Sequence, residues 1–273
     1  MDSSQAKLSV VLYRTKNVGD SVQTIALSRL LPQSAGVYRH RMKEAPADRL
    51  FVVNGMLDKD TPPKSGGPVC LFAGISGPHF REKAYLRWLS GSPFPIGARD
   101  QATVDALNRA GQPVVLTGCA TLTLPRYDGP RKGIYSVDCV GPGEQITHSI
   151  ARSTSVEVQW ETALAALARF RTAEAVYTSR LHVALPCLAF GTPVWIANPQ
   201  HNAWHPSRFS LIEEMGLEYE KLQTADVTPF ARRYVDFLEC QLGMNLEGDD
   251  PKLPTPPAKS ALPWWQHLPI KAI

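Results

Sequence analysis

Residues 173–197 read AEAVYTSRLHVALPCLAFGTPVWIA. The apolar run at 173–177 predicts a short buried strand, and 193–197 predicts a second one. Between them, residues 180–190 predict a helix, which Gly191 ends. A strand, a helix and a strand in this order are typical of a right-handed crossover between parallel strands. This stretch therefore favours the α/β fold class.

The same alternation of strand and helix fills most of the chain. Short apolar runs predict further strands at 8–13, 50–54, 69–73, 113–116 and 133–137. Runs with helical periodicity predict helices at 82–89 and 156–170. Asp20 is expected to cap a helix at 21–31, and Asp100 to cap another that Gly111 ends. This alternation implies mostly parallel sheets, in which ligands bind beyond the carboxyl ends of the strands.

Residues 125–133 interrupt the pattern with two prolines, two glycines and four charges, which is typical of a linker between domains. We therefore predict an α/β fold of two Rossmann-like domains that face a cleft, over residues 1–125 and 133–240. Residues 241–273 contain six prolines, so we expect a tail packed back on the body.

The tail carries the paired indoles Trp264 and Trp265. Two interpretations of the pair stay open. Burial of the indoles on the first domain is favoured, because no amphipathic helix accompanies them. The alternative is an anchor at the membrane interface, helped by Lys259 and Lys271.

The composition is that of an ordinary globular protein, with 44% hydrophobic and 20% charged residues among 273. The net charge of +4 suits an anionic small molecule and gives little support to a nucleic-acid partner. Five widely spaced cysteines form no CxxC pair, which predicts reduced thiols in a cytoplasmic protein and neither disulfides nor a zinc site. The apolar run at 8–13 is too short for a signal peptide.

The loop between strand 173–177 and the helix after it has the strongest chemical signal. Arg180 and His182 stand at the amino end of that helix, where backbone N–H groups and the helix dipole favour an anion. Arginine adds a planar donor fork that matches phosphate or carboxylate, and histidine can also transfer a proton. The alternative is a structural ion pair at Arg180 and a helix cap at His182.

Other loops at predicted strand ends offer weaker signals. Arg99 follows a strand end and precedes the Asp100 cap. It is interpreted either as part of a second anion site or as an ordinary surface arginine. His79 ends a flexible loop after strand 69–73. No GK[ST] follows the glycine loop at 17–20, and no GxGxxG follows the first strand, which disfavours a Walker motif and a dinucleotide site.

A late polar and aromatic loop contains His201, Trp204, His205 and Arg208. A metal site here is disfavoured, because no acidic ligand stands nearby and Pro206 interrupts the segment. Binding of a sugar acceptor is favoured, since tryptophan faces stack on flat surfaces.

Five motifs together resemble the polysaccharide pyruvyl transferase family over about residues 8–240. They are, in order, NVGD at 17–20 with Gln23 after it, GARD at 97–100, TGCAT at 117–121, SRLH at 179–182 and FGTP at 190–193. The resemblance implies a fold similar to GT-B glycosyltransferases, with two Rossmann-like domains and the active site between them. It also implies transfer of a pyruvyl group from phosphoenolpyruvate to two hydroxyls of a sugar, as a cyclic ketal.

The resemblance also implies roles for individual residues. In the family, the arginine and histidine of the late motif and an arginine of the middle motif contact the donor. On this basis we predict four donor-binding residues, namely Ser179, Arg180, Leu181 and Arg99. We predict His182 and His79 as catalytic residues, because a histidine between phosphate charges has a raised pKa and can act as the acid. The predicted acceptor-binding residues are Asn17, Asp20, Trp204 and His205.

No metal or organic cofactor is expected. The predicted partners are phosphoenolpyruvate and a sugar or lipid-linked oligosaccharide. The predicted location is the cytoplasm, with peripheral contact to the inner face of the membrane as the open alternative for the tail. Two other functions remain as alternatives: a GT-B glycosyltransferase that uses a nucleotide-sugar, and a non-catalytic anion- or sugar-binding homologue.

Overall fold

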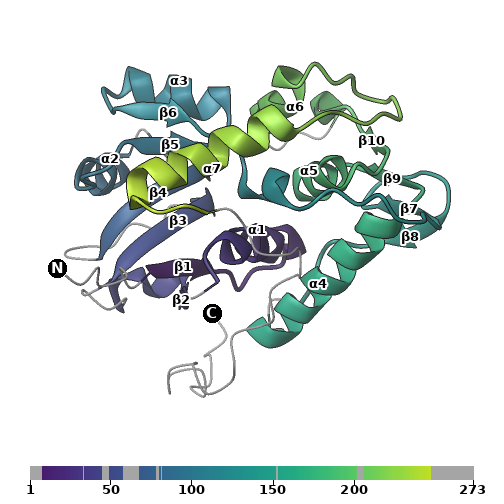
Figure 1. The fold of residues 1–273 in the computed structure, drawn as a ribbon, viewed down its shortest axis with the longest axis horizontal. Coiled ribbons are helices and arrows are strands. Elements are labelled where there is room, and N and C mark those ends of the chain that lie inside the picture. The colour runs from purple at the N-terminus through teal and green to yellow at the C-terminus, as the bar shows by residue number, and fades with distance from the viewer. Residues whose placement is uncertain are drawn as a thin grey trace.

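A computed structural model describes residues 8–32, 34–44, 49–57, 68–77, 80, 82–151, 153–201 and 206–246. Within these residues the chain forms two parallel sheets with helices packed on them (Figure 1). The predicted α/β class, with Rossmann-like halves built on parallel strands, is confirmed.

The first sheet has six parallel strands in the order β2-β1-β3-β4-β5-β6. They are β1 (Leu8–Leu12), β2 (Ala35–Tyr38), β3 (Leu50–Met56), β4 (Val69–Ser76), β5 (Ile96–Ala98) and β6 (Val114–Leu116). The helices of this half are α1 (Val18–Leu30), α2 (Lys83–Ser90) and α3 (Gln101–Arg109), with the short 3-10 turns η1 (Arg39–Glu44) and η2 (Ala120–Thr123).

The second sheet has four parallel strands in the order β10-β9-β7-β8. They are β7 (Ile134–Val137), β8 (Glu144–Ile146), β9 (Ala175–Thr178) and β10 (Val194–Ile196). The helices are α4 (Val156–Thr172), α5 (Leu181–Phe190), α6 (Ser210–Glu214) and α7 (Thr228–Leu242), with 3-10 turns η3 (Pro199–His201) and η4 (Pro206–Phe209). The strand, helix and strand expected at 173–197 are thus β9, α5 and β10.

Helix α1 begins earlier than its sequence predicts, and this corrects the expected cap. Its N-cap is Asn17, whose Oδ1 accepts from Gly19 N (3.1 Å), so Asp20 lies inside the first turn. The expected cap at Asp100 is confirmed, because Asp100 Oδ1 accepts from Thr103 N (2.9 Å). Asparagine and aspartate cap equally well, and local sequence did not decide between the two positions in α1.

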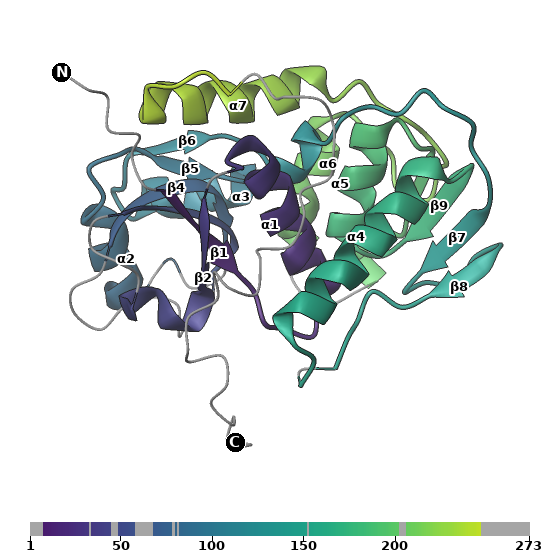
Figure 2. The same cartoon turned by 60° about the horizontal axis from the view of Figure 1, so that its bottom comes forward.

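One apolar core joins the two sheets. Successive residues of a strand point to opposite faces, so Val10 and Leu12 of β1 pack with helices α1, α4 and α5. Val11 belongs to a second core on the other face of the sheet, with residues of β3, β4 and α2. Helix α1 therefore lies between the two sheets (Figure 2).

Helix α7 runs back from the second half onto the first sheet (Figures 1 and 2). Its buried Tyr234 donates a hydrogen bond to Ala73 O in β4 (3.2 Å). The domain boundaries expected from the sequence, 1–125, 133–240 and 241–273, stay a prediction. Among the described residues, no helix is both long and apolar enough to cross a membrane.

Candidate functional site

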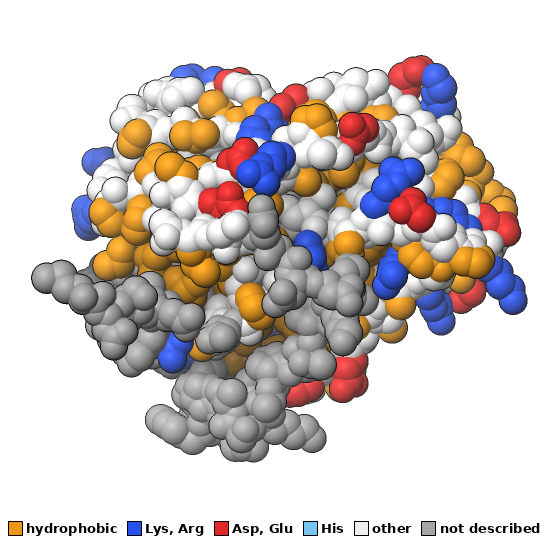
Figure 3. Space-filling model, in the orientation of Figure 1, with side chains coloured by type: hydrophobic (Ala, Val, Ile, Leu, Met, Phe, Trp, Pro, Cys, Tyr) orange, Lys and Arg blue, Asp and Glu red, His pale blue; other side chains and the backbone are white. Residues whose placement is uncertain are grey.

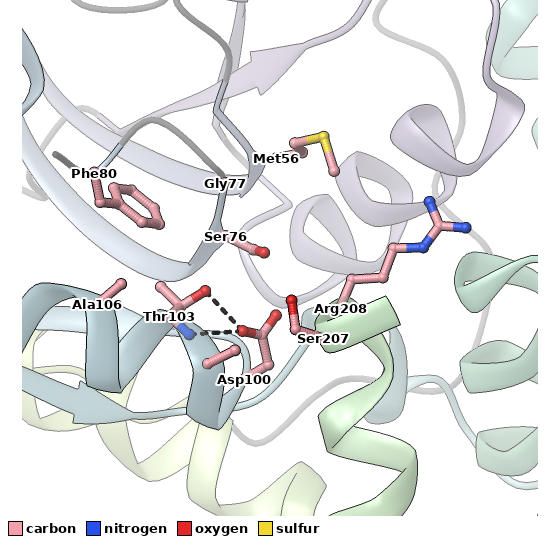
Figure 4. A pocket seen from close by; sticks show the side chains of 10 residues that line it. Met56, Ser76, Gly77, Phe80, Asp100, Thr103, Ala106, Ser207 and Arg208 are labelled. Atoms are coloured by element: carbon pink, nitrogen blue, oxygen red, sulfur yellow. Dashed lines mark hydrogen bonds between the residues drawn. The ribbon is translucent and has the colours of Figure 1, made fainter. Parts of the chain in front are cut away.

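A pocket of about 290 Å³ opens where the two halves meet (Figure 4). Its lining from the first half comes from the ends of β3 and β4 and from the start of α3, and the second half adds Ser207 and Arg208. In Figure 4 the oxygens of Ser76, Asp100 and Ser207 turn toward one another, whereas the Arg208 guanidinium points away from Asp100. The pocket lies at the carboxyl ends of the strands, where parallel sheets bind ligands.

Arg99 directly precedes the pocket residue Asp100 and is only 1% exposed. Its Nη2 donates to Ser76 Oγ (2.7 Å), and its Nε donates to Asp100 Oδ2 (3.1 Å). Asp100 in turn caps α3. The guanidinium is therefore held by two residues that line the pocket, Ser76 at the end of β4 and Asp100 before α3.

Arg180 is the N-cap residue of α5, and its side chain is more open, at 38% exposure. Its Nε donates to Asp138 Oδ2 (2.7 Å). Asp138 follows β7 with a left-handed backbone (φ 51°), and Ser179 Oγ donates to its carbonyl (2.8 Å). The Asp138 carboxylate therefore orients the Arg180 side chain, while part of the guanidinium stays available to a ligand.

The backbone N–H groups in the first turn of α5 lie beside Arg180. The first bonds back to the cap are those of Val183 and Ala184 to Arg180 O (3.2 and 3.0 Å), so the N–H groups of Leu181 and His182 precede them. His182 is 9% exposed, and its Nε2 has no hydrogen-bond partner in the described part of the chain. Such a helix start favours an anion.

The surroundings of His182 lower its pKa well below the usual 6.5. Burial is the largest cause, followed by the charges of Arg99, His148 and Arg208. The imidazole is therefore neutral in the unliganded protein. The raised pKa expected from the sequence applies to a site that holds a dianion, whose charge acts in the opposite direction.

His148 is a site residue that the sequence analysis missed. It is 2% exposed, and its Nε2 also lacks a partner among the described residues. Its backbone N–H donates to the Asp138 carboxylate (3.2 Å), and its carbonyl accepts from Val18 N (3.1 Å). Burial lowers the pKa of His148 to about 4, opposed by Asp138 and assisted by Arg180.

His148 and His182 both pack against Gly19 at the start of α1. A Cβ at Gly19 would lie 2.8 Å from His182 Cβ and 3.3 Å from His148 Nε2. Both side chains therefore pack directly against the same backbone atom. Only glycine leaves the room that this approach needs.

The site as a whole is basic. Arg208 stands in η4 beside the pocket, and burial, then Arg99 and Arg180, lower its pKa to about 10. Its Nε has no partner within the described residues. Arg99, Arg180 and Arg208 interact with one another or with His182, and a group of arginines suits a ligand with several negative charges.

The predicted acceptor residues Asn17 and Asp20 form a compact local network. Asn17 Nδ2 donates to Asp20 Oδ1 (3.2 Å), and Asp20 Oδ2 accepts from Thr15 Oγ1 (2.8 Å). The structure places them beside Gly19, and their acceptor role stays a prediction. The predicted residues His79, Trp204 and His205, and the tail pair Trp264 and Trp265, lie outside the described residues.

Across the described ranges, no group of three or more His, Cys, Asp or Glu side chains could hold a metal ion. Three residues of this site were not among the site residues predicted from the sequence. They are His148, Asp138 and Arg208. Asp138 directly follows a strand end, so the rule that selected Arg99 and Arg180 could have found it.

Comparison with known proteins supports a family. Residues 12–201 match the family model for polysaccharide pyruvyl transferase, and this range contains all five motifs. No curated protein sequence matches the chain.

Two solved structures are similar at low identity. A functionally uncharacterized protein from Klebsiella pneumoniae has a TM-score of 0.49 and 11% identity, over 77% of this chain and 90% of its own. A UDP-GlcNAc 2-epimerase from Methanocaldococcus jannaschii, in complex with UDP-GlcNAc and UDP, has a TM-score of 0.37 and 12% identity, over 93% and 97%. The assignment of this chain to a family therefore rests on the family model that matches residues 12–201, and not on these two structures.

Proposed function

The chain belongs to the polysaccharide pyruvyl transferase family, and from that premise we propose that its donor is phosphoenolpyruvate. The enzyme transfers the pyruvyl group to two hydroxyls of one sugar and releases phosphate. The acceptor is a sugar of a polysaccharide or of its lipid-linked precursor.

The observation that carries the proposal is the basic cluster at the start of α5. Phosphoenolpyruvate carries a phosphate and a carboxylate, about three negative charges near neutral pH. Arg180 offers its open guanidinium nitrogens to one of these groups, and the N–H groups of Leu181 and His182 offer two more donors. Arg99 and Arg208 add positive charge nearby, since both lower the pKa of the neighbouring His182.

The reaction balances without a cofactor. A proton adds to the vinyl carbon C3, and the first sugar hydroxyl forms a bond to C2 as it loses its own proton. The bond between C2 and the phosphate oxygen breaks, and phosphate takes the electron pair. The second hydroxyl then closes the ketal, and its proton leaves with the phosphate, while the first hydroxyl's proton replaces the one given to C3. The protein must therefore supply one acid and one base.

The proposal places the reaction in the cytoplasm. All five cysteines are free thiols, which is typical of a reducing compartment. On the face shown in Figure 3, acidic and basic side chains stand next to one another, which does not favour a nucleic-acid partner there. One such pair on α7 joins Arg232 Nε and Asp236 Oδ1 (2.7 Å).

A thermal-shift titration tests the identity of the donor. Phosphoenolpyruvate, inorganic phosphate, UDP and GDP are compared at equal concentrations. Binding to the native state alone raises the apparent stability, by about 2.7 kcal/mol at a hundredfold excess over Kd. We expect phosphoenolpyruvate to raise Tm well beyond the shift that phosphate gives.

A shift with UDP or GDP and none with phosphoenolpyruvate would favour the glycosyltransferase alternative and reject the proposed donor. Binding without any ketal product from a panel of sugar glycosides would favour the non-catalytic alternative.

A further inference from the structure

We propose that His148 and His182 work as a pair that shares one proton when the donor is bound, one as the acid and the other as the base of the reaction. The inference rests on the proposed function and adds a catalytic residue to it. His148 lies in the second half, on the segment after β8, and belongs to none of the motifs that mark the family here.

The first support is position. The built Cβ of Gly19 falls within 3.3 Å of both His182 Cβ and His148 Nε2, so His148 Nε2 lies near the His182 side chain, whose pKa the charge of His148 lowers. The segment 148–150 is fixed there by its backbone, because Asn17 bridges to Ser149 and Ile150 N donates to Lys16 O (2.9 Å). These backbone contacts between the two halves therefore hold His148 against α5.

The second support is the state of the ring nitrogens. His148 and His182 are at least nine-tenths buried, and the Nε2 atom of each lacks a hydrogen-bond partner within the described residues. An unsatisfied buried nitrogen is costly, and a structural histidine ordinarily avoids that cost by pairing. Two such nitrogens at one place are suited to a ligand that supplies the missing partners.

The third support is charge. Asp138 and Arg180 face His148, while Arg99 and Arg208 face His182. Two imidazolium rings at this separation repel each other strongly in a buried site, so the pair accepts one proton and not two. A bound dianion supplies the attraction that holds this proton. Asp138 favours the proton on His148, and the arginines favour the neutral form of His182.

With this pair, every proton of the reaction is accounted for. The protonated ring gives its proton to C3 of phosphoenolpyruvate, and the neutral ring takes the proton of the attacking hydroxyl. When the second hydroxyl closes the ketal, its proton leaves with the phosphate. The pair again holds one proton at the end of the cycle, on the other ring.

A purely structural role for the His148 side chain is less well supported. Its backbone makes the contacts that fix the segment, and these do not depend on the imidazole. The ring packs beside Phe170, with centroids 6.1 Å apart, and an apolar side chain would make that contact equally well.

Nitrogen NMR of protein labelled with ¹⁵N-histidine tests the pair in the full chain at pH 7. Phosphoenolpyruvate is the probe, inorganic phosphate the comparison, and the His148→Gln and His182→Gln variants assign the two rings by loss of their signals. We expect the donor to shift both rings and to produce one imidazolium between them. We also expect His148→Gln to change the Kd for phosphoenolpyruvate less than about threefold, because the ring moves a proton and does not clamp the anion.

Ser149→Ala, an exposed neighbour, is the matched control and should leave both rings and the Kd unchanged. A response from His182 alone would overturn the pair and leave the donor assignment intact. Two rings that shift but both stay neutral, or both become charged, would overturn proton sharing. No response from either ring would overturn the donor itself. If His148→Gln fails to fold, His148→Asn takes its place in the assignment of the His148 ring.

Discussion

Asp138 occupies a backbone conformation that few residues adopt, and it does so beside the residue we assign to donor binding. Its φ of 51° is left-handed, and its carboxylate holds Arg180 at 2.7 Å. Asparagine tolerates this backbone, whereas alanine costs about 1 kcal/mol there. Strain at such a position is typical of sites where geometry matters more than stability.

Replacement of Asp138 should therefore separate affinity from stability. We expect Asp138→Asn to weaken phosphoenolpyruvate binding about fivefold, because Arg180 loses its charged partner, with unfolding free energy changed by less than about 1 kcal/mol. Asp138→Ala should add about 1 kcal/mol of destabilisation. Calorimetric titration and urea unfolding measure the two effects. Unchanged affinity in both variants would show that Arg180 needs no such partner.

The two neutral histidines make stability depend on pH. Burial lowers the pKa of His148 to about 4 and the pKa of His182 well below 6.5. Below pH 6.5 the unfolded chain binds protons that the folded chain does not, so the free energy of unfolding falls as pH falls from about 6.5 toward 4. Each such histidine contributes roughly 1.4 kcal/mol per pH unit in that window.

Urea unfolding at pH 7 and pH 5 should show this loss in the wild type and a smaller loss in His148→Gln. Comparison of each protein with itself at pH 7 removes the cost of altered packing. Equal pH dependence in the two proteins would mean that His148 titrates normally in the folded state.

Local sequence predicted the residues that we propose to bind the anion better than it predicted their partners. Arg180 and His182 stand directly between a clear strand and a clear helix, so position alone marked them. His148 follows β8, a strand of three residues, Glu144–Ile146, with no apolar pattern to reveal it. Its role depends on contact with α1, more than a hundred residues earlier, which no local rule detects.

At the scale of elements, the contact between α1 and α5 depends on Gly19. Alanine is a better helix former by up to about 1 kcal/mol, which alone would stabilise α1. A Cβ there would lie 2.8 Å from His182 Cβ, and overpacking of that kind costs about 1–3 kcal/mol. The steric term is larger, so Gly19→Ala should destabilise the protein and weaken donor binding together.

Thermal unfolding with and without phosphoenolpyruvate measures both effects of Gly19→Ala. Ser28→Ala in the same helix gains helix propensity without this contact and should be neutral or slightly stabilising. A stabilised Gly19→Ala protein would contradict the close approach of α1 to α5.

At the scale of the whole molecule, alternation of strands and helices was enough to predict two parallel halves. It could not predict how they join. The shared core and the return of α7 to Ala73 depend on packing between distant segments, and the sequence pattern of α7 indicates only which of its faces is apolar. The strands β2 and β8 were also missed, since β2 (AGVY) contains a glycine and β8 (EQI) begins with two polar residues, so neither gives a clear apolar run.

The most direct test of the donor site is calorimetric titration of phosphoenolpyruvate into the wild type, Arg180→Ala and Arg126→Ala. Arg126 lies on the exposed linker, paired with Asp128, and serves as the matched control. We expect the wild type to bind, Arg126→Ala to bind equally, and Arg180→Ala to bind at least about tenfold more weakly. Equal affinity in all three proteins, or no binding to the wild type, would contradict a donor site at the start of α5.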